Sequence, residues 1–267
     1  MTAPTRPGAL VTDNRVPEPD AGFWVLKILT TGMGETTSDF FVKAFAPELV
    51  VPVALLVLIA ALVLQFRTRR YRPATYWTSA LMVSVFGTMA ADVLHVGLGV
   101  PYTVSTVGFA VALAIVFIVW WRVERTLSVH EIRTARREGF YWAAVMTTFA
   151  LGTAAGDLTA TSLGLGYLAS GFLFLLVFAV PGVFFALTRR AAVATFWIAY
   201  VTTRPLGASF ADWFAVSKAR GGMDVGSGPV SAVLLLGFIV LVAVLSARLR
   251  SGEGGRRLAV GEPEGLA

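Results

Sequence analysis

The sequence predicts an all-α integral membrane protein with eight transmembrane helices, arranged as four parallel two-helix repeats. Three observations predict this class: 56% of the 267 residues are hydrophobic, only 14% are charged, and several apolar runs approach twenty residues. A helix of about twenty residues, rising ~1.5 Å per residue, crosses the roughly 30 Å hydrocarbon core of a bilayer. This composition excludes an ordinary soluble domain.

One pattern of residues occurs four times along the chain. An aromatic residue precedes a tryptophan, a glycine follows that tryptophan after ten positions, and an aspartate follows it after fifteen. The four copies are Phe23, Trp24, Gly34 and Asp39; Tyr76, Trp77, Gly87 and Asp92; Tyr141, Trp142, Gly152 and Asp157; and Phe196, Trp197, Gly207 and Asp212. Because the chain has only seven tryptophans, four matches in register indicate an internal repeat.

Each repeat is predicted to contribute a helix that carries the motif, followed by a plainly apolar helix. The motif helices are expected at 23–41, 76–96, 141–161 and 196–216, and the apolar helices at 49–66, 102–121, 167–187 and 229–247. The repeats then span about 23–66, 76–121, 141–187 and 196–247 of a single transmembrane domain, 23–247. Residues 1–22, with four prolines, and 248–267 are predicted to be disordered tails in the cytoplasm.

The two kinds of helix differ in charge. The motif helices carry carboxylates and many small residues, whereas the apolar helices carry no charged side chain. A charge at membrane depth must face the bundle interior or a wet cavity, while a helix that is apolar on all sides can face lipid. We therefore expect four polar inner helices and four apolar outer helices.

Basic residues concentrate in the connections between repeats. These residues are Arg67, Arg69, Arg70, Arg72, Arg122, Arg125, Arg133, Arg136, Arg137, Arg189 and Arg190. By the positive-inside rule these connections lie in the cytoplasm, and with eight spans both termini lie there too. The expected location is the inner (plasma) membrane of the cell. Two spans per repeat also bring every repeat into the membrane from the same side, which disfavours an inverted-repeat fold.

Short motifs in the chain resemble those of a known family. They are the aromatic residue before tryptophan, Gly-Thr-x-x-x-Asp at Gly87–Asp92 and Gly152–Asp157, and Gly-Leu-Gly at Gly97–Gly99 and Gly164–Gly166. The family comprises bacterial multi-pass membrane proteins built from a two-helix repeat of unknown function, described as uncharacterised membrane-anchored proteins. The resemblance covers about 23–247 and implies a multi-helix membrane fold without an established activity. Repeats one and four depart from the pattern, with Gly34-Glu35 and Gly207-Ala208 in place of Gly-Thr.

The intramembrane carboxylates are the candidate ligands of a cation or proton. A charge near the centre of a membrane helix costs about 2.5–3.5 kcal/mol, so each needs compensation. Glu35 and Asp39 share one helical face, as do Asp92 and His95, and could meet at one centre. Candidate site residues are Asp39, Asp92, Asp157, Asp212, Glu35, His95 and Arg204, with the motif glycines Gly34, Gly87, Gly152 and Gly207.

The chemistry of that site is only partly defined by its residue types. Oxygen ligands suit hard cations or shared protons, but no particular metal is indicated and no cofactor is expected. Alternatively, each aspartate caps a neighbouring segment or bonds nearby Thr, Ser and backbone groups, and serves only to hold the repeat together. The glycines fit close helix packing.

Arg204 is the only arginine inside a predicted span. Its burial calls for a carboxylate partner, and Asp212, eight residues away, lies ~12 Å along an unbroken helix. We therefore expect a pair with Glu35 or Asp39 of the first repeat; the alternative is that Arg204 lines a wet vestibule. Pro205 predicts a kink or break in this helix.

Three classes of function fit the sequence. A transporter or channel, for a cation or a proton-coupled small solute, explains polar helices surrounded by apolar ones. A membrane scaffold or anchor, or an intramembrane enzyme, is the alternative, although the chain has no cysteine and only two histidines. We interpret the chain as a transporter or channel and not as an enzyme. Its expected partners are the lipid bilayer and a cation or proton; the net charge of +6 is spread over connections and does not indicate nucleic acid.

Overall fold

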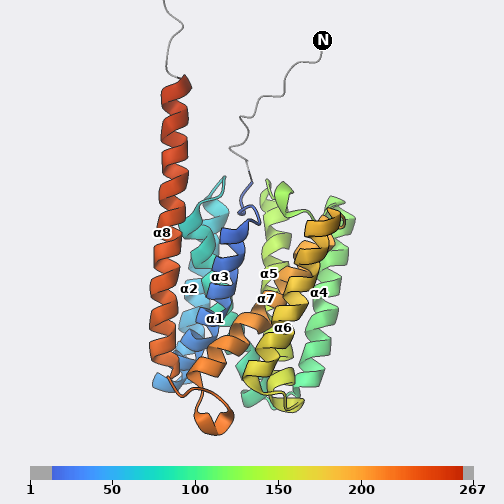
Figure 1. Ribbon diagram of the computed structural model, residues 1–267, viewed down its shortest axis with the longest axis vertical. Helices are drawn as coiled ribbons and strands as arrows, with labels where there is room; N and C mark the ends of the chain where they lie inside the picture. Colours follow the sequence, from blue (N-terminus) through green and yellow to red (C-terminus); the bar gives the residue numbers. More distant parts are fainter. Residues whose placement is uncertain (1–13, 261–267) are drawn as a thin grey trace, which may run out of the picture.

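The computed structural model describes residues 14–260, which form eight α-helices and no strand (Figure 1). The helices are α1 (Ala21–Ala44), α2 (Pro47–Arg67), α3 (Pro73–Asp92), α4 (Tyr102–Glu124), α5 (Ala135–Asp157), α6 (Gly166–Thr188), α7 (Ala192–Ala215) and α8 (Ser227–Val260). Short π-helical turns follow α3 (Val93–Gly97) and α5 (Leu158–Ser162), and 3-10 turns lie at Val129–Glu131 and Lys218–Arg220. The predicted all-α class and the number and order of helices are confirmed.

Local sequence signals explain where these helices begin and turn. Pro47 and Pro73 open α2 and α3, where a missing backbone N–H costs nothing. The Asp20 side chain accepts a hydrogen bond from the Phe23 backbone N–H at the start of α1. Gly99 and Gly164 have φ of +67° and +70°, which explains a glycine in the Gly-Leu-Gly turns.

The motif helices form a closed ring of contacts. Helix α1 packs against α3, α3 against α5, α5 against α7, and α7 against α1. Each apolar helix packs mainly on the motif helix of the following repeat: α2 on α3, α4 on α5 and α6 on α7. The last apolar helix, α8, packs on α1 and so closes the circle between the fourth and first repeats.

The motif glycines lie where neighbouring motif helices approach most closely. Each faces the residue seven positions after the tryptophan of the next repeat, which gives the pairs Gly34 with Ser84, Gly87 with Phe149, Gly152 with Arg204, and Gly207 with Thr31. A Cβ on Gly34 would lie 1.8 Å from Ser84 Oγ, and one on Gly207 would lie 2.0 Å from Thr31 Oγ1. Gly34, Gly152 and Gly207 therefore have no room for a side chain, and a Cβ on Gly87 would lie a tight 3.3 Å from Phe149 Cβ, in agreement with a packing role.

The motif tryptophans cluster inside one end of the bundle. Trp77 and Trp142 are 0% and 2% exposed, and Trp197 is also buried. The indole N–H of Trp77 donates to the Tyr71 hydroxyl at 3.0 Å, and that of Trp197 donates to the Leu127 carbonyl at 3.0 Å. Three of the four tryptophans thus pack in the core rather than on the surface.

Among the described residues, five helices are long and apolar enough to cross a membrane: α2, α3 with its π-helical turn, α4, α6 and α8. They expose large apolar side chains; Leu56 on α2 is 65% exposed and Val233 on α8 is 71% exposed. Such surfaces are expected against lipid. The remaining three helices, α1, α5 and α7, are more polar. Helix α7 continues through Pro205, so of the predicted kink or break, the break does not occur.

The part of the chain that the structure describes extends beyond the predicted domain at both ends. The expected tail of residues 1–22 is replaced from Asn14 onward by a packed segment: the Asn14 side chain donates to the Val129 carbonyl at 2.8 Å. Arg15 forms a 2.7 Å ion pair with Glu138, whose side chain is fully buried. Helix α8 continues to Val260. The parts of the predicted tails at 1–13 and 261–267 lie outside the described residues.

Candidate functional site

All four motif aspartates line one cavity of about 370 Å³. It lies at the end of the bundle that carries the links within repeats, because its walls also include Arg220 from one of those links and Lys43, Tyr102 and Tyr167 from the helix ends beside them. Glu35, one helical turn before Asp39, also lines this cavity. The internal repeat therefore brings four carboxylates to one place, and Glu35 of the first repeat adds a fifth.

Helix geometry explains this convergence. The four aspartates share one register in four helices that form one ring, so they reach the same depth. Asp92 and Asp157 are the last residues of α3 and α5, and each is followed at once by a five-residue π-helical turn. Such turns occur frequently at functional sites because they displace side chains from the regular helical positions.

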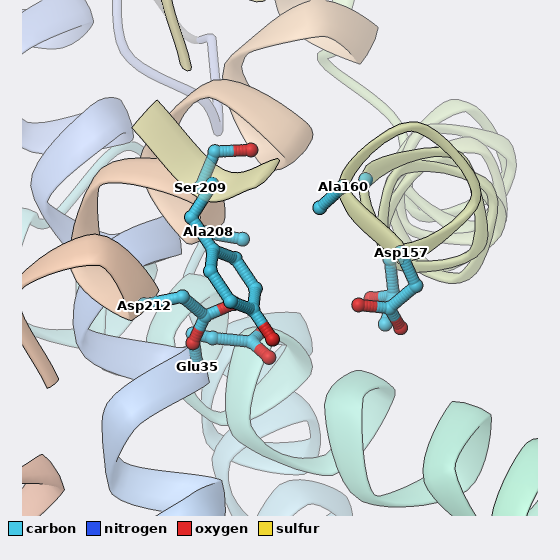
Figure 2. A pocket seen from close by; sticks show the side chains of 9 residues that line it. Glu35, Asp157, Ala160, Ala208, Ser209 and Asp212 are labelled. Carbon is cyan, nitrogen blue, oxygen red and sulfur yellow. The ribbon is translucent and has the colours of Figure 1, made fainter. Parts of the chain in front are cut away.

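A smaller pocket of about 10 Å³ lies between Glu35, Asp157 and Asp212. Figure 2 shows Glu35 and Asp212 close together on one side and Asp157 on the other. A volume of this size holds about one water molecule. Both cavities share Glu35, Asp157, Asp212 and Tyr167, so the small pocket adjoins the larger one.

The cavity carries more carboxylates than basic side chains. Asp39 pairs with Lys43, and Arg220 donates to the Tyr167 hydroxyl at 2.6 Å. Within the part of the chain that the structure describes, the carboxylates of Asp92, Asp157 and Asp212 form no ion pair and accept no side-chain hydrogen bond. In that same part of the chain, no three His, Cys, Asp or Glu side chains lie close enough together to hold a metal ion. The carboxylates are spread around the wall rather than gathered at a point.

Arg204 lies fully buried beneath the cavity and pairs with Glu35. Its guanidinium also donates to Thr88 Oγ1 at 2.5 Å and to Thr153 Oγ1 at 2.9 Å. Its other guanidinium nitrogen donates to the Thr31 carbonyl of α1 at 3.4 Å, so α1, α3 and α5 all contact an arginine on α7. The expected pairing with the first repeat is found, and Glu35 rather than Asp39 is the partner.

The space below Arg204 is filled by buried side chains. The Lys27 ammonium is buried, lies 4.0 Å from the Phe149 ring centroid and 4.3 Å from that of Tyr200, and makes no hydrogen bond within the described residues. The hydroxyl groups of Tyr76 and Tyr141 form a 2.5 Å hydrogen bond further toward the tryptophan cluster. The cavity is therefore closed toward that end of the bundle.

His95 does not line the cavity. Its Nε2 forms a 2.7 Å hydrogen bond with Ser105 Oγ on α4, and its ring packs 4.2 Å from that of Tyr102. The structure therefore places His95 in the contact between the π-helical turn and α4.

Several residues of the site escaped the sequence analysis. Thr88 and Thr153 hold Arg204, and the signal was present, because both directly follow a motif glycine. Tyr102 and Tyr167 line the cavity from equivalent positions, twenty-five residues after Trp77 and Trp142. Lys27 has no counterpart in the other repeats and gave no pattern to follow.

A family model described as Repeat of Unknown Function (DUF347) matches the chain four times, at residues 22–71, 75–126, 140–191 and 195–251. These bounds agree with the four repeats predicted from the tryptophan–glycine–aspartate pattern. No curated protein and no solved structure matches the chain. Since the four matches together cover most of its length, the chain belongs to the DUF347 repeat family, whose function is unknown.

Proposed function

We propose that this protein transports a cation, or a small solute coupled to protons, across the bacterial inner membrane. The single observation that supports this most is the convergence of all four motif aspartates on one cavity. Five carboxylates around the wall of one cavity within the membrane need counter-charge, and a bound cation or bound protons supply it. A motif that served only to hold each repeat together would not require the aspartates of different repeats to share a cavity.

A transporter fits this geometry better than an open channel. The cavity ends at the buried pair of Arg204 and Glu35, and the side chains of Lys27 and Phe149 fill the space beneath. A protein that is open at one end and closed at the other corresponds to one state of an alternating-access cycle. Arg204 would then act as an internal cation that holds Glu35 while the site is empty.

In the proposed arrangement all eight helices cross the membrane. The ring of α1, α3, α5 and α7 forms an inner layer, and α2, α4, α6 and α8 separate it from lipid. The arginine-rich connections and both termini lie in the cytoplasm, so the carboxylate cavity opens on the opposite side. Solute would enter from outside the cell or leave toward it.

Transport into proteoliposomes tests this proposal. Vesicles with wild-type protein, Asp157→Asn or Glu131→Gln would be compared for uptake of Mn²⁺, Mg²⁺, Ca²⁺, tetramethylammonium and protons. Glu131 is the matched control because it is an exposed carboxylate outside the cavity. We expect uptake of at least one cation above that of protein-free vesicles, its loss in Asp157→Asn, and its retention in Glu131→Gln.

Gel filtration of each variant separates loss of transport from loss of fold. Equal uptake by wild type and a folded Asp157→Asn would remove the aspartates from the mechanism. Absence of uptake for every cation tested, with folded wild-type protein in the vesicles, would favour the scaffold or anchor instead.

A further inference from the structure

We propose that the solute is a lipophilic organic cation, with its charged head in the carboxylate cavity and its apolar body in a groove between α2 and α8. This inference rests on the proposed transport function and narrows it to a class of substrate. It depends on three observations: the groove, the wall that it shares with the cavity, and the chemistry of the cavity itself.

The groove is a volume of about 960 Å³ lined by α1, α2, α3 and α8. Its lining contains aromatic and aliphatic residues such as Phe41, Leu49, Val53, Val85 and Leu235, and no charged side chain. Figure 1 shows α8 running alongside the part of the bundle formed by α1 and α2. Pockets that bind organic ligands have volumes of roughly 300–1,000 Å³ and mainly apolar walls, so the groove is large enough for several rings or an alkyl chain.

Met89 on α3 belongs to both the groove and the carboxylate cavity. It is 1% exposed and packs with Ala54 and Val85 in a small apolar cluster. On α2, Val50 lines the groove and the adjacent Val51 lines the cavity. The two spaces are therefore separated by a thin apolar wall centred on an unbranched side chain, which can change rotamer more readily than a branched one.

The cavity is suited to an organic cation. Five carboxylates line it, against two basic side chains, Lys43 and Arg220. The Arg220 guanidinium lies 5.8 Å from the ring centroid of Tyr167, so a cation already occupies one aromatic face of this site. Organic ammonium ions are recognised by aromatic rings and dispersed negative charge, and they do not need the six to eight oxygen ligands at 2.3–2.6 Å that Ca²⁺ needs.

An amphiphile with a positive head is complementary to both spaces at once. A phospholipid acyl chain would match the groove alone, and the groove contains no lysine or arginine to hold its phosphate. A small hydrated cation would match the cavity alone and leave the groove without a role. An acidic cavity on one side of Met89 and an apolar groove on the other match the charged head and the apolar body of a lipophilic cation, which we therefore favour over the other two occupants.

Binding to the full-length protein in lipid nanodiscs tests the proposal, with empty nanodiscs as background. The probes are tetraphenylphosphonium, its anionic counterpart of the same shape tetraphenylborate, and the small cation tetramethylammonium. Val53→Trp and Leu235→Trp fill the groove from opposite helices, while Val63→Trp adds the same bulk at an exposed position of α2 outside it. Asp92→Asn removes one carboxylate of the cavity.

We expect wild type to bind tetraphenylphosphonium at least about tenfold more tightly than tetramethylammonium, since burial of even one ring contributes that much. Val53→Trp and Leu235→Trp should weaken tetraphenylphosphonium binding by a similar factor and leave tetramethylammonium binding unchanged. Asp92→Asn should weaken both, and Val63→Trp neither. Tetraphenylborate should not bind above background.

Two results would overturn the inference. Equal binding of tetraphenylphosphonium and tetraphenylborate would show apolar binding without charge recognition. Unchanged tetraphenylphosphonium binding in both groove variants would show that the groove does not take part. If tetramethylammonium still bound in an Asp92-dependent way, the proposed cation transport would stand without this substrate class. If no cation bound at all, both the transport proposal and the substrate proposal would be refuted.

Discussion

Breaking the buried pair between Arg204 and Glu35 should destabilise the protein sharply. Arg204 is fully buried and Glu35 is 7% exposed, so Arg204→Gln leaves a carboxylate in the core without its counter-charge. Removing one member of a buried pair costs about 3–5 kcal/mol, because the remaining charge is not solvated. For a protein of this size that corresponds to a fall in Tm of roughly 6–20 °C.

The double variant tests whether the pairing itself is responsible. Glu35→Gln in the Arg204→Gln background removes the stranded charge and leaves two amides that can bond Thr88 and Thr153, so part of the lost stability should return. We expect an interaction free energy of about 1–3 kcal/mol between the two sites. Tm would be measured by tryptophan fluorescence in one detergent at one protein concentration.

Asp39→Asn is the matched control. Its carboxylate pairs with Lys43, which is 60% exposed, so the loss should be below about 1 kcal/mol. Asp39→Asn should also fail to rescue Arg204→Gln, because Asp39 does not contact Arg204. Strictly additive losses for Arg204→Gln and Glu35→Gln, or rescue by Asp39→Asn in place of Glu35→Gln, would refute the assignment.

Three further predictions concern topology, layering and packing. In this cysteine-free chain, a single cysteine at Ser217 should react with an impermeant thiol reagent in intact cells, whereas one at Arg136 should not. Labelling of the Arg136 site would contradict the predicted orientation. Leu56→Asp, at a 65% exposed position of α2, should abolish accumulation in the membrane, because a charge facing lipid costs about 2.5–3.5 kcal/mol. Leu56→Ala should accumulate normally. Equal accumulation of the two variants would contradict the outer position of α2. Gly34→Ala should reduce the yield of monodisperse protein, because its Cβ would lie 2.9 Å from a backbone carbon of α3. Gly108→Ala, with open space around it, should not reduce the yield. Equal yields would contradict the close approach of α1 and α3.

The periodic features of the sequence were sufficient to predict the number, order and approximate bounds of the helices. Four copies of one motif, each followed by a charge-free apolar run, predicted eight helices whose bounds agree with the structure to within a few residues at most ends. Helix α8 is one exception, since it continues to Val260, past the predicted end at 247. Helix α5 is another: it begins at Ala135, well before the predicted start, because the Thr134 hydroxyl caps it by accepting a hydrogen bond from the Arg137 N–H. No apolar signal marks that first, polar turn.

Contacts between distant segments were harder to predict. Burial of Arg204 pointed to a partner in the first repeat, but Glu35 and Asp39 lie one turn apart on the same face, and only the depth of α7 relative to α1 separates them. The segment before α1 is rich in proline and poor in apolar residues, which is typical of disorder. It packs against the bundle through contacts such as that of Arg15 with Glu138, over a hundred residues away.

The packing of each apolar helix on the following repeat has no signature in one sequence either. The choice between the neighbouring motif helices is made by shape and loop length, which a hydropathy pattern does not contain. This arrangement matters for the site, because it brings Ala54 and Val50 of α2 against Met89 of α3 and so forms the wall of the carboxylate cavity.

Uptake by the double variant of Asp92 and Asp157 tests most directly whether the repeat-related carboxylates act as one site. Initial rates of cation uptake per folded protein would be compared for Asp92→Asn, Asp157→Asn and the two together. If both carboxylates serve one bound cation, either single change removes most of the uptake. The double variant then has an uptake rate no lower than that of the slower single variant, because effects of residues that act as a unit are non-additive. Losses that multiply, as expected for independent groups, or full uptake in the double variant, would contradict a shared site.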